Sequence, residues 1–151
     1  GNSEKQEAVK ALGAEIAVNY KEEDFAEVLK EIGIDVILDM IGGDYYEKNI
    51  DLLNPDGRLV YINSMGGAKV TANLMKIMQK RLTVTGSTLR SREYAFKRQL
   101  TEDIRRDVLP LLVEGHFKPV ICATFPLAEA DKAHELMESS AHIGKIVLEV
   151  N

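Results

Sequence analysis

The feature that most constrains the fold is a pair of apolar runs, each of which is followed by two glycines. Residues Ile34–Met40 read IDVILDM and Arg58–Ser64 read RLVYINS, and the glycine pairs follow at Gly42-Gly43 and Gly66-Gly67. Continuous Val, Ile and Leu runs of this length are typical of parallel strands that are buried on both faces. Ligands of open parallel sheets bind beyond the carboxyl ends of the strands, so we expect the site in the two loops after these runs.

Helical stretches and further short strands surround the two runs, which predicts an α/β fold with a mostly parallel sheet. Asn54-Pro55-Asp56-Gly57 is a strong turn signal. In the first helix, Ser3 is a candidate N-cap and Gly13 a C-terminal stop. The expected helices are Ser3–Leu12, Glu22–Glu31, Asp44–Leu53, Thr71–Lys80, Ser91–Glu114 (kinked or ended near Pro110) and Leu127–Ser140. The further strands are expected at Glu15–Tyr20, Leu82–Leu89, Ile121–Phe125 and Lys145–Val150.

Composition excludes several classes of partner. The net charge of −5 argues against nucleic acid, because nucleic-acid-binding domains normally carry a basic face. No apolar run approaches the length of a membrane span and no signal-peptide pattern is present, so we expect no membrane partner and a cytoplasmic location. The single cysteine, Cys122, fits a reducing compartment. It and the three histidines are too scattered for a metal site, so we expect no metal.

Five stretches carry a resemblance that covers nearly the whole chain: Lys10–Asp24, Asp35–Gly43, Leu53–Ile62, Gly86–Arg92 and Ile143–Leu148. In this order and spacing they are similar to the coenzyme-binding part of the medium-chain dehydrogenase/reductase superfamily. The resemblance is greatest to its zinc-independent quinone oxidoreductase branch, the zeta-crystallin-like proteins.

The resemblance implies a truncated Rossmann-like fold. In that family a GroES-like catalytic domain precedes a Rossmann domain with strand order 3-2-1-4-5-6. No G-x-G-x-x-G loop occurs in this sequence, and the chain is expected to begin at the end of the second Rossmann strand. We therefore expect residues 1–118 to form a partial dinucleotide-binding domain that lacks the first strand and glycine loop. Residues 119–151 are expected to form a C-terminal segment that normally packs with the catalytic domain.

The resemblance also implies an NADP site near the start of the chain. In NADPH-dependent relatives a lysine and a tyrosine, at the positions of Lys5 and Tyr20, hold the adenosine 2′-phosphate. An ammonium and a phenol can both donate hydrogen bonds to a phosphate dianion. The acidic residue that selects NAD is not seen here, and Asn2 offers a further donor. Without the resemblance, Lys5 would be a solvated helix lysine and Tyr20 a half-buried strand end.

At the nicotinamide end, the resemblance points to two loops and one histidine. Asn63, Ser64 and Met65 lie in the loop after the second apolar run, and Thr88 and Leu89 follow a later strand. By resemblance, the first loop lies against the nicotinamide side of the cofactor and the second offers backbone groups to its carboxamide. His142 precedes Ile143, at a place where relatives can touch the cofactor. The alternatives are an ordinary tight turn, a strand end and a lone surface histidine.

No residue is a credible catalytic acid, base or nucleophile. Asp39 lies at the end of an apolar run, where a carboxylate that turns the Gly42-Gly43 loop is the simpler account. Glu22, Glu23 and Asp24 lie in the first turn of an expected helix, where the helix dipole favours negative charge.

The sequence therefore predicts a fragment of an NADPH-dependent quinone oxidoreductase-like enzyme. The parent would transfer hydride to a quinone or another electron-poor small molecule, and this chain alone is expected to be inactive, with weak or no NADP binding. The alternative is a stand-alone, non-catalytic interaction or scaffold module that retains the fold. A methyltransferase would also need a glycine-rich first loop, and it fits the C-terminal segments poorly.

The missing central strands would leave an apolar strand edge exposed. With Glu15–Tyr20, Ile34–Met40, Arg58–Asn63 and Leu82–Thr88 as sheet positions 3, 4, 5 and 6, the gap falls between the first two of these. We expect either that the first of these strands pairs directly with the second, or that another copy of the chain completes the sheet in a homo-oligomer.

Overall fold

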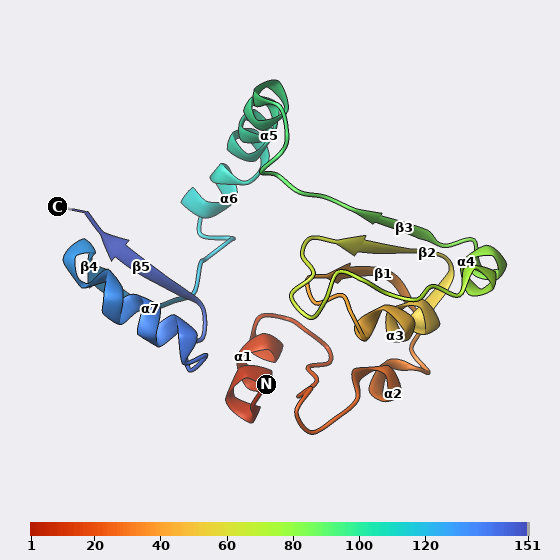
Figure 1. Ribbon diagram of the computed structural model, residues 1–151. Helices are drawn as coiled ribbons and strands as arrows, with labels where there is room; N and C mark the ends of the chain where they lie inside the picture. Colours follow the sequence, from red (N-terminus) through yellow and green to blue (C-terminus); the bar gives the residue numbers. More distant parts are fainter. Residues whose placement is uncertain (151) are drawn as a thin grey trace. The chain divides into compact units, whose positions relative to one another are not determined.

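The computed structural model describes residues 1–150, which divide into two compact units (Figure 1). The first unit comprises residues Gly1–Glu93, and the second begins at Tyr94. Among the described residues, no helix combines the length and the apolar composition that crossing a membrane requires.

The first unit contains a parallel sheet with strand order β1-β2-β3. Its strands are β1 (Ile34–Asp39), β2 (Leu53–Tyr61) and β3 (Thr83–Gly86), and both neighbouring pairs are parallel. The two apolar runs are thus adjacent strands, as predicted, with Ile37 opposite Leu59. The parallel order brings the carboxyl ends of all three strands to one edge of the sheet.

Two crossover helices connect these strands and bury one face of the sheet. Helix α3 (Tyr45–Leu52) links β1 to β2, and α4 (Leu74–Lys80) links β2 to β3. The buried core comprises Tyr46, Ile50, Leu53, Leu59 and Leu82. Full burial of each aliphatic side chain contributes about 1.5–3 kcal/mol, so burial of this cluster stabilises the unit.

The other face of the sheet is exposed, contrary to the prediction that the strands are buried on both faces. Val36 and Leu38 of β1 are 57% and 65% exposed. The reason is that α3 and α4 are both crossovers between successive parallel strands and cover the same face (Figure 1).

The prediction of a strand at Glu15–Tyr20 is wrong. These residues lie between α1 (Ser3–Ala11) and α2 (Phe25–Leu29) and join no sheet. A strand exists only where its backbone groups have a ladder partner, and here the Ala17 carbonyl instead accepts a hydrogen bond from Gln6 Nε2 at 2.8 Å. Direct pairing of this segment with β1 is therefore excluded within the described chain.

The helix ends show which polar residues cap them. Asn2, rather than Ser3, is the N-cap of α1, since its side chain accepts from Lys5 N at 2.8 Å. Gly13, with φ +105°, follows the helix end as predicted. Asp24 is the N-cap of α2, so Glu22 and Glu23 precede the helix rather than lying in its first turn.

The predicted turn at residues 54–57 interrupts the pairing of β1 with β2. Ile34 pairs with Leu53 but Val36 pairs with Arg58, so the ladder skips these residues. Asp56 adopts a left-handed conformation, with φ +66°. Its carboxylate accepts two hydrogen bonds from Arg81, at 2.8 and 2.6 Å.

The second unit pairs two parallel strands, β4 (Ile121–Pro126) and β5 (Lys145–Glu149). Between them lie a short 3₁₀ turn (Leu127–Glu129) and helix α7 (Ala130–Glu138), which confirms the predicted order. The charged stretch before them is broken near Pro110 into α5 (Tyr94–Asp107) and α6 (Leu109–Val113), as expected of a proline that lacks a backbone donor.

Candidate functional site

The loops that follow β1 and β2 are joined to each other by backbone hydrogen bonds. Gly42 and Gly67 form a parallel bridge. Gly43 N donates to the Gly67 carbonyl at 2.9 Å, and Gly66 N donates to the Ile41 carbonyl at 2.7 Å. The ladder of the two strands therefore continues beyond their ends, and it fixes the two glycine pairs side by side.

Only glycine permits this close approach. Gly42 and Gly43 have φ values of +66° and +52°. A Cβ atom on Gly42 would lie 2.7 Å from the Gly67 carbonyl oxygen, and one on Gly43 would lie 2.6 Å from the Gly66 carbonyl oxygen. Glycine is therefore required at both positions for two reasons: the positive φ disfavours other residues, and there is no room for a Cβ atom.

The Asp39 carboxylate, at the end of β1, accepts hydrogen bonds from the backbone of the Gly42-Gly43 loop. It is 5% exposed and accepts from Ile41 N at 2.6 Å and from Gly42 N at 3.2 Å. Asn49 of α3 donates to its second oxygen at 2.9 Å. The prediction that the Asp39 carboxylate turns the Gly42-Gly43 loop is confirmed, because two backbone amides of that loop donate to it.

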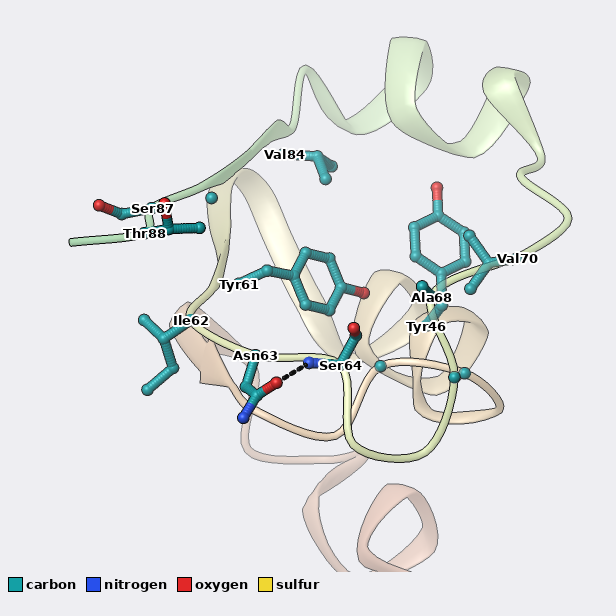
Figure 2. Close-up of a pocket in the computed structure, with 14 residues that line it drawn as sticks. Tyr46, Tyr61, Ile62, Asn63, Ser64, Ala68, Val70, Val84, Ser87 and Thr88 are labelled. Carbon is teal, nitrogen blue, oxygen red and sulfur yellow. Dashed lines mark hydrogen bonds between the residues drawn. The ribbon is translucent and has the colours of Figure 1, made fainter. Parts of the chain in front are cut away.

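A pocket of about 570 Å³ lies at the carboxyl ends of the three strands. Its apolar walls come from Tyr46, Tyr61, Val70 and Val84 (Figure 2). Polar side chains line it where β2 and β3 end: Asn63, Ser64, Ser87 and Thr88. Apolar walls with a few polar side chains are typical of a small-molecule site.

Of the predicted nicotinamide-side residues, the structure brings Asn63, Ser64 and Thr88 together in this pocket. Asn63 Oδ1 accepts from Ser64 N at 2.8 Å, and the Thr88 hydroxyl is 2.8 Å from the Ser91 hydroxyl. Met65 and Leu89 are their neighbours in sequence but do not line the pocket, and they are 70% and 54% exposed.

Sequence reasoning missed the aromatic wall of this pocket. Tyr61 lies one residue before Ile62, and its ring lines the pocket while its Oη is buried. Burial, and then the nearby Asp39 and Tyr46, raise the pKa of Tyr61 to about 12. The alternation of side chains along a strand could have predicted this, because Leu59 and Tyr61 are two residues apart and therefore lie on the same face of the sheet.

At the start of the chain, Gly1, which precedes α1, lies next to Asn19, the residue before Tyr20. A Cβ on Gly1 would clash with Asn19 Oδ1. Desolvation, and then the positive charges of Lys21 and Lys5, lower the pKa of the Gly1 amino group. Lys21, which the sequence analysis did not single out, therefore shares this neighbourhood with Lys5.

Asn2 and Tyr20 are the other two residues predicted to bind the adenosine 2′-phosphate. The Asn2 side-chain oxygen caps α1, which leaves its amide group as the donor for a ligand. Tyr20 is 62% exposed and lines a shallow depression with Lys21, Phe25, Tyr45 and Lys48. The exposed phenol keeps its hydrogen-bonding capacity open to a ligand.

His142 belongs to the second unit, and its Nδ1 is buried without a hydrogen-bond partner among the residues described. Cys122 is exposed. Within residues 1–150, no three His, Cys, Asp or Glu side chains gather as metal ligands would.

Comparison with known proteins agrees with this architecture. The family model described as zinc-binding dehydrogenase matches residues 12–148. A 2-haloacrylate reductase from Burkholderia is 33% identical over 153 residues, which cover 96% of this chain and 45% of the relative. Quinone oxidoreductase 1 of Escherichia coli is 32% identical over 155 residues, which cover 98% of this chain and 47% of that protein.

The solved structure of Escherichia coli quinone oxidoreductase complexed with NADPH superimposes with a TM-score of 0.80 at 30% identity. The match covers 99% of this chain and 48% of that one, so the chain spans about half the length of the relatives it resembles. These findings confirm the resemblance drawn from the five sequence stretches. The chain belongs to the zinc-binding dehydrogenase family, and it corresponds to the C-terminal, coenzyme-binding portion of the quinone oxidoreductase branch of the medium-chain dehydrogenase/reductase superfamily.

Proposed function

We propose that this chain is the coenzyme-binding part of an enzyme that transfers hydride from NADPH to a quinone or another electron-poor small molecule. The observation that carries the proposal is the pocket at the carboxyl ends of β1, β2 and β3, where Asn63, Ser64 and Thr88 converge. This is the edge at which open parallel sheets bind their ligands. A structural relative at 30% identity was solved in complex with NADPH.

The residues present fit a nicotinamide ring. Val70 and Val84 line the pocket with apolar surface that would contact the ring, and the Ser64 and Thr88 side chains would offer polar groups to its carboxamide. When bound, NADPH supplies the hydride. This chain's own contribution is to orient the ring against the two interlocked glycine loops and to shield one side of it from water.

For the other end of the cofactor, we propose that Lys5, Tyr20 and Asn2 bind the adenosine 2′-phosphate. The proximity of Lys5 and Lys21 to Gly1 supports this role, because two ammonium groups near one point favour a dianion. On the resemblance alone, His142 is proposed as a further cofactor contact, and Met65 and Leu89 as backbone contacts.

We further propose that the isolated chain binds NADPH weakly and does not transfer hydride. The sequence contains no G-x-G-x-x-G loop, and the helix N-terminus after such a loop normally binds the pyrophosphate. The parent's domain boundary is proposed at residue 118, with residues 119–151 packing on the catalytic domain.

The decisive experiment is a chimera in which the N-terminal half of Escherichia coli quinone oxidoreductase precedes this chain. We expect NADPH-dependent quinone reduction by the chimera and none by the 151-residue chain alone. Lys5→Ala in the chimera should raise KM for NADPH about tenfold while leaving KM for NADH unchanged, because only NADPH carries the 2′-phosphate. A folded but inactive chimera would refute the proposal and favour the non-catalytic module.

The open edge of β1 supports a proposed homo-oligomer. Within the described chain β1 pairs with β2 alone, so its other edge has no strand partner. Unpaired edges of this kind associate with other chains. Light scattering should give at least twice the monomer mass, and a purely monomeric species would refute this proposal.

A further inference from the structure

The Tyr61 hydroxyl is a buried polar group with no assigned role. Its Oη is shielded from solvent and has no hydrogen-bond partner among residues 1–150. Buried hydroxyls in folded proteins are almost always hydrogen-bonded, so an orphan of this kind needs an explanation. Its position in the wall of the pocket suggests one.

Tyr61 is held firmly at the end of β2. It pairs with Gly86 of β3, and Ser87 N donates to its carbonyl oxygen at 2.9 Å. A Cβ on Gly86 would lie 3.2 Å from that oxygen, so the two strand ends are in close contact. Figure 2 shows the ring extending into the pocket, with its hydroxyl on the side of Ser64 and Tyr46.

Asp39, whose charge acts on the Tyr61 hydroxyl, is not its hydrogen-bond partner. The Asp39 carboxylate already accepts from Ile41 N, Gly42 N and Asn49 Nδ2. Burial, and then Asp39 and Tyr46, raise the pKa of Tyr61 to about 12. The phenol is therefore protonated at neutral pH, and it offers a hydrogen-bond donor.

We propose that Tyr61 determines specificity by donating a hydrogen bond to a carbonyl oxygen on a flat conjugated ring bound in the pocket. The inference rests on the proposed function, which supplies two such rings: the nicotinamide with its carboxamide, and the quinone acceptor. Because the hydroxyl is shielded from solvent, this hydrogen bond requires a side chain of the exposed loop at Asn63 and Ser64 to rotate when the ligand binds.

The test is an NMR titration of the chimera described above, in which the cofactor site is expected to be complete, with two probes, nicotinamide and tetramethyl-1,4-benzoquinone. The four methyl groups of this quinone occupy the ring carbons to which a thiol such as the exposed Cys122 would otherwise add covalently. Wild type is compared with Tyr61→Phe and with Tyr45→Phe. Tyr45 is a matched control that does not line this pocket. Its ring packs at a tilt against Phe25, with the ring centroids 4.7 Å apart.

We expect Tyr61→Phe to weaken the binding of one probe about three- to tenfold, as the loss of one neutral hydrogen bond predicts. The weakened probe identifies the source of the carbonyl. The same substitution should leave the unfolding midpoint unchanged or raise it, because it removes an unsatisfied hydroxyl. Tyr45→Phe should bind both probes as wild type does.

Three results would overturn the inference. Equal binding of both probes by Tyr61→Phe and wild type would refute the hydrogen bond, while the chimera assay would still decide the proposed function. A lowered unfolding midpoint without loss of affinity would show a purely structural tyrosine. Failure of wild type to bind either probe would remove both the inference and the assignment of this pocket to the nicotinamide side.

Discussion

The carboxylate of Asp39, at the end of β1, accepts a hydrogen bond from the side chain of Asn49, in the middle of α3, at 2.9 Å. The two residues are 5% and 3% exposed. Because the same carboxylate also accepts from two backbone groups of the first glycine loop, this pair ties the helix, the strand and the loop together.

Removing this carboxylate should destabilise the first unit. We expect Asp39→Ala to lower the free energy of unfolding by about 2–4 kcal/mol, because Asn49 and two loop amides lose their acceptor. Urea denaturation measures the change. The exchange Asp39→Asn with Asn49→Asp restores a donor–acceptor pair and should recover part of the loss. An exchange variant as unstable as Asp39→Ala would show that the pair is not the cause.

Adding one methyl group to a glycine loop should disturb both loops. We expect Gly43→Ala to cost about 2–4 kcal/mol, because the left-handed φ and the contact with the Gly66 carbonyl both oppose a Cβ. Gly13→Ala is the control, since its φ is also positive but no atom lies within 4 Å of the added Cβ. Amide shifts across residues 62–67 should change only in the Gly43 variant, and equal shifts in both variants would contradict the interlock.

Lys80 should contribute to stability more than a surface lysine does. Its ammonium donates to the carbonyl oxygens of Ile50, Asp51 and Leu53 at 3.0, 2.8 and 2.8 Å, at the end of α3. Lys80→Met should therefore cost about 1–2 kcal/mol.

The control for Lys80 is Lys30→Met. Lys30 forms an exposed ion pair with Glu27, and surface pairs of this kind contribute about 0–1 kcal/mol. Thermal unfolding of the two variants compares the effects directly. Equal destabilisation would show that the three carbonyl contacts of Lys80 add nothing.

High pH should destabilise the protein through Tyr61. Its pKa is about 12 in the folded chain, against 10.0 for an unperturbed tyrosine. The folded state thus holds the proton more tightly than the unfolded state, and this contribution is complete below pH 10. It is lost as the pH rises from 10 to 12, by on the order of 2 kcal/mol.

The variant Tyr61→Phe separates the contribution of Tyr61 to the free energy of unfolding from the contributions of other groups that titrate at high pH. The difference in unfolding free energy between variant and wild type, measured from pH 7 to pH 11.5, should shift in favour of the variant above pH 10. A constant difference across this range would mean that the phenol has an ordinary pKa.

The strands around the site could be predicted because their apolar runs and glycine ends are local signals. Ile34–Met40 contains enough β-branched residues to specify a strand wherever a partner lies beside it. The role of Asp39 followed from its place between a strand and a glycine pair. Glu15–Tyr20 has similar local character but lacks a ladder partner, and sequence patterns do not report which partners are present.

The aromatic wall of the pocket could not be predicted in the same way. The burial of the Tyr61 hydroxyl depends on the loop after β2 and on Tyr46 of α3, which are brought together only by the crossover. The N-cap of α1 was predicted wrongly for a simpler reason. Asn2 and Ser3 are equally good caps by type, and the backbone conformation decides between them.

The most direct test of the account is a crystal structure of the chimera grown with NADPH. The account predicts the nicotinamide ring in the pocket beside Asn63, Ser64 and Thr88, and the adenosine 2′-phosphate beside Lys5 and Tyr20. A cofactor that binds with its nicotinamide elsewhere, or a pocket filled by the protein's own side chains while NADPH is bound, would contradict it.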